Sequence, residues 1–160
     1  MILSTALAGI SFAPWVPAWK KDLKRILALA DLKPEQKFYE LGSGTGRVCF
    51  YINKMTDAEA IGLEIALPFY LVSKFKQLFL KSHHIKFKFK NFFKQNLSDA
   101  DVVYFFGMPK PLKDKLRIKL EKELKPGARV ISYVFPIEAW QPKVIDKPKE
   151  NDIAIYLYIR

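Results

Sequence analysis

The chain has 160 residues, enough for one domain with a substantial core and too few for a second folding unit. Half of the residues are hydrophobic and 14% are aromatic, which excludes a disordered chain. The formal net charge is +11 and comes mostly from lysine, so it favours an acidic partner over bidentate reading of phosphates or bases. The single cysteine, Cys49, excludes an internal disulfide and is expected to be a small buried residue in a reducing compartment.

The first nineteen residues carry no charged side chain, which raises the question of a membrane segment or a signal. Their apolar run stops at Ala13, Pro14 and Pro17 interrupt the rest of the segment, and no basic region precedes it. We expect this segment to pack on the domain, with interfacial membrane contact left open. An amphipathic helix is expected to begin at Pro17 and to end before Pro34.

From residue 37 onward, short apolar runs alternate with amphipathic segments. Strands are expected at 37–41, 60–63, 85–90, 101–106, 128–135 and 153–159, and helices at about 46–54, 68–81 and 112–124. After Pro136 there is only a proline- and lysine-rich connection, so the last strand is expected to be antiparallel to its neighbours. The pattern predicts a single α/β domain with a mostly parallel, twisted sheet and helices on both faces.

The first expected strand breaks into the glycine-rich turn Gly42-Ser43-Gly44-Thr45-Gly46, and a helix is expected after it. Glycines allow positive φ angles and a close approach of backbone to ligand, and the start of the helix adds the positive end of its dipole. A dinucleotide fingerprint would need a third glycine where Arg47 stands. The turn therefore predicts a small anionic or polar ligand and disfavours a dinucleotide.

Acidic residues flank this turn in a characteristic way. Glu40 precedes it, and Glu64 ends the second expected strand. Ligands of open α/β sheets bind beyond the carboxyl ends of the strands, which also brings in the loop at Asn91-Phe92. The arrangement resembles the first motif and the acidic loop of Rossmann-like methyltransferases that use S-adenosyl-L-methionine (SAM).

The resemblance implies a role for each matching residue. SAM would be the cofactor, with the turn Gly42 to Gly46, including Ser43, Gly44 and Thr45, holding its methionine end. Glu64 would accept hydrogen bonds from the ribose hydroxyls, and Ile65 would cover the purine face. Asn91 and Phe92 would border the adenine, and Glu40 belongs to the same cofactor-binding set.

Further segments are similar to a narrower family. The run Ala13-Pro14-Trp15-Val16-Pro17, together with 38–47, 62–64, 91–93 and 119–140, resembles the small archaeal-type protein-lysine methyltransferases. Their mitochondrial relatives methylate the ATP synthase c-subunit and the adenine nucleotide translocator. The likeness implies that residues 1–16, through Pro14, Trp15 and Val16, fold over the cofactor. Family members commonly have Asp where this chain has Glu40 and Thr45, so we expect a shift in cofactor geometry with the acidic group kept at position 40.

Methyl transfer to a lysine needs a neutral amine, which a nearby hydroxyl can orient. Tyr104 and Tyr133, near the ends of two central strands, are the candidate catalytic residues, and aromatic packing is the alternative for both. Since a protein at +11 repels basic peptides, we expect acceptor lysines in acidic or neutral surroundings, or the protein's own lysines.

Other functions stay open at this point: an RNA or small-molecule methyltransferase, or a non-catalytic SAM-binding module. His83 and His84 are adjacent and lack the spaced Cys and His partners of a zinc site, so no metal is expected. The relatives often carry an upstream membrane helix, which leaves membrane proximity open. We expect a cytoplasmic, monomeric protein, with membrane association and nucleic-acid contact as weaker alternatives.

Overall fold

The structure, a computed structural model, describes residues 18–80, 84–106 and 115–160. Its strands are β1 (Lys37–Leu41), β2 (Glu59–Glu64), β3 (Ile85–Phe89), β4 (Val102–Phe106), β5 (Arg129–Tyr133), β6 (Val144–Asp146) and β7 (Ile155–Ile159). Its helices are α2 (Lys20–Ala30), α3 (Arg47–Thr56), α4 (Leu67–Leu80) and α6 (Arg117–Glu123), with a short 3-10 helix η1 (Phe92–Lys94).

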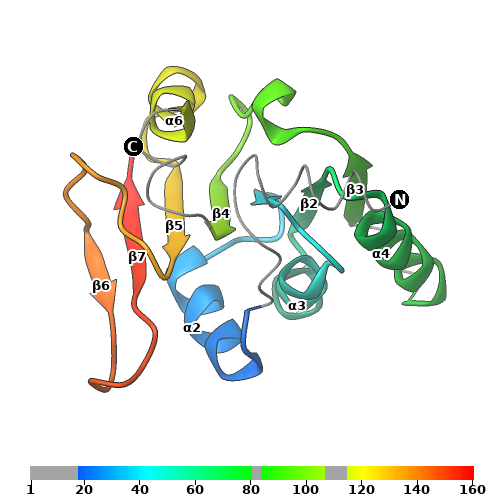
Figure 1. The fold of residues 1–160 in the computed structure, drawn as a ribbon, viewed down its shortest axis with the longest axis horizontal. Coiled ribbons are helices and arrows are strands. Elements are labelled where there is room, and N and C mark those ends of the chain that lie inside the picture. Colours follow the sequence, from blue (N-terminus) through cyan, green and yellow to red (C-terminus); the bar gives the residue numbers. More distant parts are fainter. Residues whose placement is uncertain (1–17, 81–83, 107–114) are drawn as a thin grey trace.

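The strands form one sheet in the order β3-β2-β1-β4-β5-β7-β6 (Figure 1). Neighbours from β3 to β5 are parallel, whereas β7 runs antiparallel to both β5 and β6. The mostly parallel α/β sheet with an antiparallel C-terminal strand is thereby confirmed.

Most strand and helix ends lie within two residues of those expected, and the larger differences concern β6 and α2. Strand β6 falls in the connection after Pro136, where three residues between prolines are too few to show an alternating pattern. Helix α2 begins at Lys20 and not at Pro17, because Trp19 has an extended backbone and forms its N-cap. Helix α6 begins at Arg117, while the start expected at Leu112 lies outside the described residues.

Both faces of the sheet are covered, and each has its own hydrophobic core. On one face, Leu41 and Phe105 pack with Leu116 and Leu120 at the α6 side. On the other face, the core includes side chains from β1, β4, β5, α2 and α3, among them Phe38, Val102, Tyr104, Tyr133, Ile26 and Ile52. Alternating residues of β4 thus enter opposite cores, which explains its continuous apolar run.

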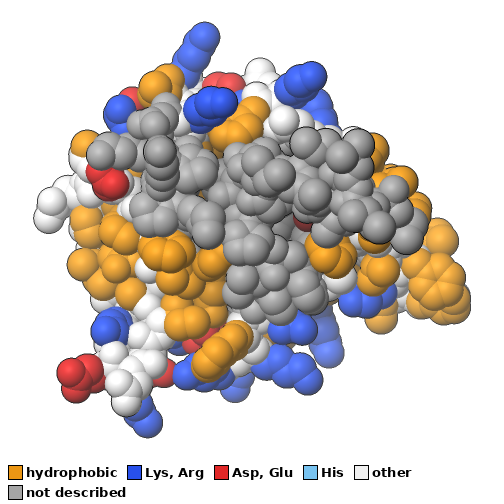
Figure 2. Space-filling model, viewed as in Figure 1, with side chains coloured by type: hydrophobic (Ala, Val, Ile, Leu, Met, Phe, Trp, Pro, Cys, Tyr) orange, Lys and Arg blue, Asp and Glu red, His pale blue; other side chains and the backbone are white. Residues whose placement is uncertain are grey.

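Helix α4 lies along β3 at the end of the sheet (Figure 1). Only Ser73 of this helix is fully buried, and large apolar side chains on its outer side are exposed. Figure 2 shows them as hydrophobic atoms at the right-hand edge of the molecule. No helix in the described ranges is long and apolar enough to cross a membrane. The expected packing of residues 1–16 falls outside these ranges and stays a prediction, as does the single-domain boundary at 1–160.

Candidate functional site

The parallel register aligns the carboxyl ends of the central strands. Leu41 of β1 pairs with Leu63 of β2 on one side and with Phe105 of β4 on the other. The strand order changes direction around β1, which is where ligands bind in sheets of this kind. Glu40, the glycine turn and Glu64 are therefore brought together at one edge of the sheet.

All three glycines of the turn have backbone angles that favour glycine, and packing adds a second requirement at Gly46. Gly42, Gly44 and Gly46 have φ angles of 80°, 52° and 78°, a region that other residues rarely adopt. A Cβ atom at Gly46 would clash with the Phe87 ring, lying 2.7 Å from its Cε1 atom, so packing also requires glycine there. Among the described residues, a Cβ atom at Gly42 would meet nothing within 4 Å, which leaves open space beside the turn.

The turn is held to the end of β2 by its own amides. Gly42 and Ser43 both donate to the Leu63 carbonyl at 2.9 Å, and Gly46 donates to the Ser43 carbonyl at 2.8 Å. The Gly44 amide donates to Glu64 Oε2 at 2.7 Å. These four N–H groups are engaged within the protein and are therefore not available to a ligand. The turn offers a ligand a backbone surface that the glycines leave free of side chains.

Glu64 fastens the turn to the loop after β2. Besides the Gly44 amide, its carboxylate accepts from the amides of Ile65 at 2.9 Å and Ala66 at 2.7 Å, both at Oε1. Burial raises the pKa of Glu64, and the three amide donors oppose that rise. A carboxylate has about four lone-pair sites, so three amides leave capacity for a hydroxyl donor. The geometry is compatible with the ribose-binding role expected from the sequence.

Glu40 is buried below the turn and caps helix α3. Its Oε2 accepts from the backbone amide of Cys49 at 3.1 Å, in the first turn of a helix whose N-cap, Gly46, has no side chain. Burial raises the pKa of Glu40 to about 8, hydrogen bonds from Cys49 oppose the rise, and the charge of Glu64 adds to it. The site thus contains a carboxyl group that is largely neutral at pH 7 and close to ionising.

The Ser43 hydroxyl indicates that the turn has an unmet hydrogen bond. In the part of the chain that the structure describes, its Oγ is the buried side-chain polar atom that lacks a partner. Buried polar groups are normally paired, so each exception calls for an explanation such as strain, a catalytic role, or a bound water or ion. The Ser43 Oγ lies against β2, where a Cβ atom at Gly62 would be 2.8 Å from it. The open space at Gly42 and the two buried carboxyl groups fit a polar, positively charged ligand such as SAM.

The remaining predicted cofactor contacts lie at the same edge with different exposures. Ile65 directly follows Glu64 and is partly buried. Asn91 follows β3, and its side chain accepts from the Phe93 amide at 2.9 Å to cap η1. Phe92 is buried in the core on the α6 face, so its side chain also serves packing. Pro14, Trp15 and Val16 lie outside the described residues.

The two candidate tyrosines share a sheet face but have different surroundings. Tyr104 pairs in register with Glu40, so both side chains leave the same face of the sheet. Burial raises the pKa of Tyr104 well above its usual range, and the charge of Glu40 adds to the effect. This places the Tyr104 ring next to the buried carboxyl group of the candidate site.

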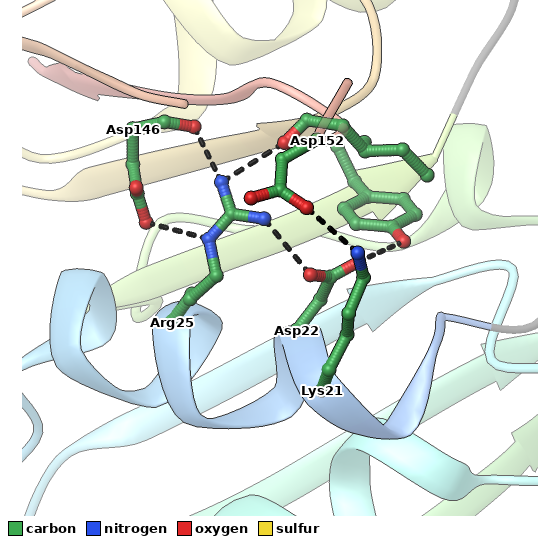
Figure 3. A network of polar contacts seen from close by, with 7 residues as sticks. Lys21, Asp22, Arg25, Asp146 and Asp152 are labelled. Atoms are coloured by element: carbon green, nitrogen blue, oxygen red, sulfur yellow. Dashed lines mark hydrogen bonds and ion pairs between the residues drawn. The ribbon is translucent and has the colours of Figure 1, made fainter. Parts of the chain in front are cut away.

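Tyr133 belongs to a polar network between β5 and α2. Figure 3 labels other members of this network, Asp22, Arg25 and Asp146. Its hydroxyl donates to Asp22 Oδ2 at 2.7 Å, and Asp22 Oδ1 accepts from Arg25 at 2.8 Å. Arg25 reaches across to Asp146 at 3.0 Å and to the Ile153 carbonyl at 2.9 Å. The Tyr133 hydroxyl is therefore committed to a structural link, a role that the sequence pattern did not reveal.

Sequence reasoning also missed a strained residue beyond β5. Val134 has a φ angle of 79°, which is costly for a β-branched side chain, and its amide donates to the Ala154 carbonyl at 3.0 Å. It lies at the same edge of the sheet as the glycine turn, where such strain is common in functional sites. Nothing in the sequence around Val134 signals a positive φ angle.

Comparison with known proteins supports the same kind of site. Residues 40–144 match the model of the ANTKMT methyltransferase domain. The chain is 32% identical to a protein-lysine N-methyltransferase of Saccharolobus islandicus, over 96% of this chain and 97% of the relative. It is also 32% identical to the adenine nucleotide translocase lysine N-methyltransferase of Mus musculus, over 82% of this chain but only 57% of that relative.

Among solved structures, an RNA methyltransferase from Salinibacter ruber in complex with S-adenosyl-L-homocysteine has a TM-score of 0.84 and 28% identity. The match covers 90% of this chain and 93% of that one. An O-methyltransferase from Thermotoga maritima has a TM-score of 0.68 at 14% identity, which indicates a shared fold. The expected resemblance is confirmed: the chain belongs to the ANTKMT methyltransferase domain family and is a SAM-dependent methyltransferase with the class I fold.

Proposed function

We propose that this protein transfers methyl groups from SAM to lysine ε-amines of proteins. The observation that carries the proposal is the match to the Saccharolobus islandicus protein-lysine N-methyltransferase, which extends over nearly the whole of both chains. Two mouse relatives whose names specify lysine methylation match over 51% and 57% of their own lengths. The relatives agree on lysine as acceptor and differ in the protein that carries it.

The cofactor supplies an electrophilic methyl group, and we propose that the residues at the edge of the sheet bind it. The proposed set is Pro14, Trp15, Val16, Glu40, Gly42, Ser43, Gly44, Thr45, Gly46, Glu64, Ile65, Asn91 and Phe92. The buried carboxyl groups of Glu40 and Glu64 favour a cationic ligand when ionised, and Glu40 reaches that form as the pH rises through about 8. The open space beside Gly42 leaves room for it at the turn.

Tyr104 is the better candidate for orienting the acceptor amine. In the transfer, the amine nitrogen forms a bond to the methyl carbon, the bond from sulfur to that carbon breaks, and a proton passes to solvent. The raised pKa of Tyr104 keeps its phenol protonated, so it can hydrogen-bond a neutral amine without a negative charge that would hold the amine protonated. The Tyr133 hydroxyl instead links β5 to α2 through Asp22.

We expect Tyr133→Phe to lower mainly the stability of the protein and Tyr104→Phe to lower mainly its kcat. Tyr133→Phe removes a donor from buried Asp22 and should lower the free energy of unfolding by about 1–3 kcal/mol. Methyl transfer per folded molecule should then change little. Tyr104→Phe should reduce kcat at least about tenfold with little loss of stability. Urea denaturation and initial rates measured on both variants check this, and equal effects on kcat would contradict the assignment.

The acceptor class can be tested directly. Purified protein and radiolabelled SAM are incubated separately with a protein extract, a tRNA pool and a metabolite pool. We expect label in protein, on lysine after hydrolysis, and a rate that falls as substrate basicity rises at low salt, because the enzyme carries +11. Label confined to RNA would overturn the proposal, and no label anywhere would favour a SAM-binding module.

A pair of substitutions on β2 provides the control for this assay. Glu64→Gln weakens the acceptor of three amides at the site and should lower incorporation at least about tenfold. Glu59→Gln makes the same chemical change at the other end of the strand, where the side chain pairs with Lys86 at the surface. It should leave incorporation unchanged, so any loss in Glu64→Gln reports on the site.

RNA methylation is the second candidate, and one specific observation favours it. The Salinibacter ruber structure, which matches nearly the full length of this chain, is described as an RNA methyltransferase. The net charge of +11 is compatible with a polyanion, although lysine dominates it. The tRNA arm of the labelling experiment distinguishes this function from lysine methylation.

A further inference from the structure

Helix α4 exposes apolar side chains where a surface helix normally presents polar ones. Leu78, Phe79 and Phe75 are 73%, 70% and 63% exposed, and Leu71 and Val72 on the same helix are also exposed. The polar Ser73 is the residue that α4 buries against the sheet. The usual amphipathic arrangement is therefore reversed on this helix.

The exposed side chains form one continuous ridge. At about 3.6 residues per turn, positions 71, 75, 78 and 79 fall on one side of a helix, with 72 beside them. The rings of Phe75 and Phe79 are 4.6 Å apart and form its centre. Phe89 of β3, 51% exposed, contacts Tyr70 of α4 with ring centroids 5.6 Å apart and so lies beyond Lys74 from this stripe. We call the five helix residues Leu71, Val72, Phe75, Leu78 and Phe79 the α4 ridge. Figure 2 shows hydrophobic side chains gathered at this edge of the molecule.

Lysines flank the ridge, and acidic residues are absent from this part of the sequence. On the helix, Lys74 and Lys76 lie on opposite sides of the apolar stripe. Lys74 bonds a neutral partner, the Gln77 amide oxygen at 3.0 Å, so its charge is not neutralised there. No Asp or Glu occurs from 65 to 98, so no acidic residue of this segment can pair with the two lysines of the helix.

We propose that the α4 ridge binds the surface of an anionic lipid bilayer. A helix with an apolar face and flanking lysines is suited to lie in the headgroup region, with aromatic and aliphatic side chains inserted and ammonium groups near lipid phosphates. The high exposure of Phe75 and Phe79 makes the surface a projecting ridge, which inserts into lipid more readily than it holds a peptide. Two copies meeting through this face would oppose lysine to lysine, which disfavours a dimer.

The proposal does not depend on the methyl acceptor, because α4 acts here as a binding surface. The ridge nevertheless starts close to the site: α4 begins at Leu67, three residues after Glu64. A bilayer bound at the ridge would therefore lie beside the edge of the sheet that holds the glycine turn.

Vesicle co-sedimentation of the full chain tests the proposal. We expect binding to vesicles of phosphatidylcholine and phosphatidylglycerol in equal parts, and much weaker binding to phosphatidylcholine alone. The double substitution Phe75→Ser with Phe79→Ser should weaken binding about 100-fold, about tenfold for each ring. Lys74→Gln with Lys76→Gln should weaken vesicle binding about fivefold per lysine. Added salt should also weaken vesicle binding by the wild type.

A matched pair elsewhere on the surface controls for a general loss of apolar area. Ile118 and Ile145 are 55% and 59% exposed and lie on α6 and β6, away from the ridge. Ile118→Ser with Ile145→Ser should leave vesicle binding within about twofold of the wild type. Thermal unfolding of all variants checks that each is folded.

Three results would overturn the proposal. The first is absence of wild-type binding to the anionic vesicles. The second is equal binding by the wild type and the double phenylalanine variant, which would assign lipid contact to another segment. The third is a lipid-free dimer, detected by analytical ultracentrifugation, that the double phenylalanine variant converts to monomer, since that would assign the ridge to a second copy.

Discussion

Gly46→Ala is expected to lower the free energy of unfolding by about 2–4 kcal/mol and to reduce SAM binding with it. Two costs combine at this position. The φ angle of 78° is unfavourable for any residue with a Cβ atom. The new methyl group would also clash with the ring of Phe87, which is buried in the core and close to Phe50, and so has little room to move. Urea denaturation and calorimetric titration with SAM measure the two effects.

Gly42→Ala and Gly127→Ala separate backbone strain from steric overlap. Their φ angles are 80° and 82°, close to that of Gly46, but a Cβ atom at either position meets none of the described residues within 4 Å. Each should cost only about 1–2 kcal/mol. Gly42→Ala should in addition weaken SAM binding, because its methyl group enters the space beside the turn, whereas Gly127→Ala should not. Equal destabilisation by all three substitutions would show that the Phe87 overlap is relieved at no cost.

Glu40→Gln is expected to change how stability depends on pH. The pKa of this carboxyl group is about 8 in the folded protein, against an ordinary value of 4.5, so the folded state favours the protonated form. The stabilisation that protonated Glu40 contributes to the folded state is therefore fully present below about pH 4.5 and is lost as the pH rises through about 8. At about 1.4 kcal/mol per pH unit, the wild type should lose on the order of 5 kcal/mol over this interval on account of Glu40.

The glutamine variant should not show this loss. Its amide oxygen can still accept from the Cys49 amide, so near pH 5 the two proteins should be about equally stable. Near pH 9 the variant should be the more stable one. Guanidinium denaturation of both proteins across this range gives the difference, and parallel pH profiles would contradict the raised pKa. Since ionised Glu40 favours a cationic cofactor, SAM affinity should rise through about pH 8 in the wild type relative to the variant.

Local pattern was sufficient to predict most of the fold. Period-two and period-3.6 signals located the strands β1 to β5 and β7 and the helices α3 and α4, because these elements bury one stripe or one face of their own sequence. The same reasoning failed for β6, whose three residues pair with β7 at an edge and are largely exposed. An edge strand of that length depends on its neighbour and leaves no hydrophobic pattern.

Part of the candidate site could likewise be predicted from the sequence, and part of it could not. The glycine spacing predicted a small polar ligand, and its resemblance, together with Glu40 and Glu64, to Rossmann-like methyltransferases implied SAM. The roles of the individual residues stay predictions. The internal use of the turn amides, the α3 cap by Glu40 and the commitment of Tyr133 to Asp22 were not predictable. Each joins residues that only the folded chain brings together.

The family, the cofactor and the order of elements can be inferred from the amino-acid sequence alone, because short motifs and local periodicity carry them. Which buried groups are paired depends on the folded chain, which leaves Ser43 without a partner among the described residues and raises the pKa of Glu40. Folding also turns the apolar side of α4 outward, which the hydrophobic composition of that helix would not suggest. The physical reason is that burial and pairing are properties of neighbours, and the neighbours of these residues come from distant parts of the chain.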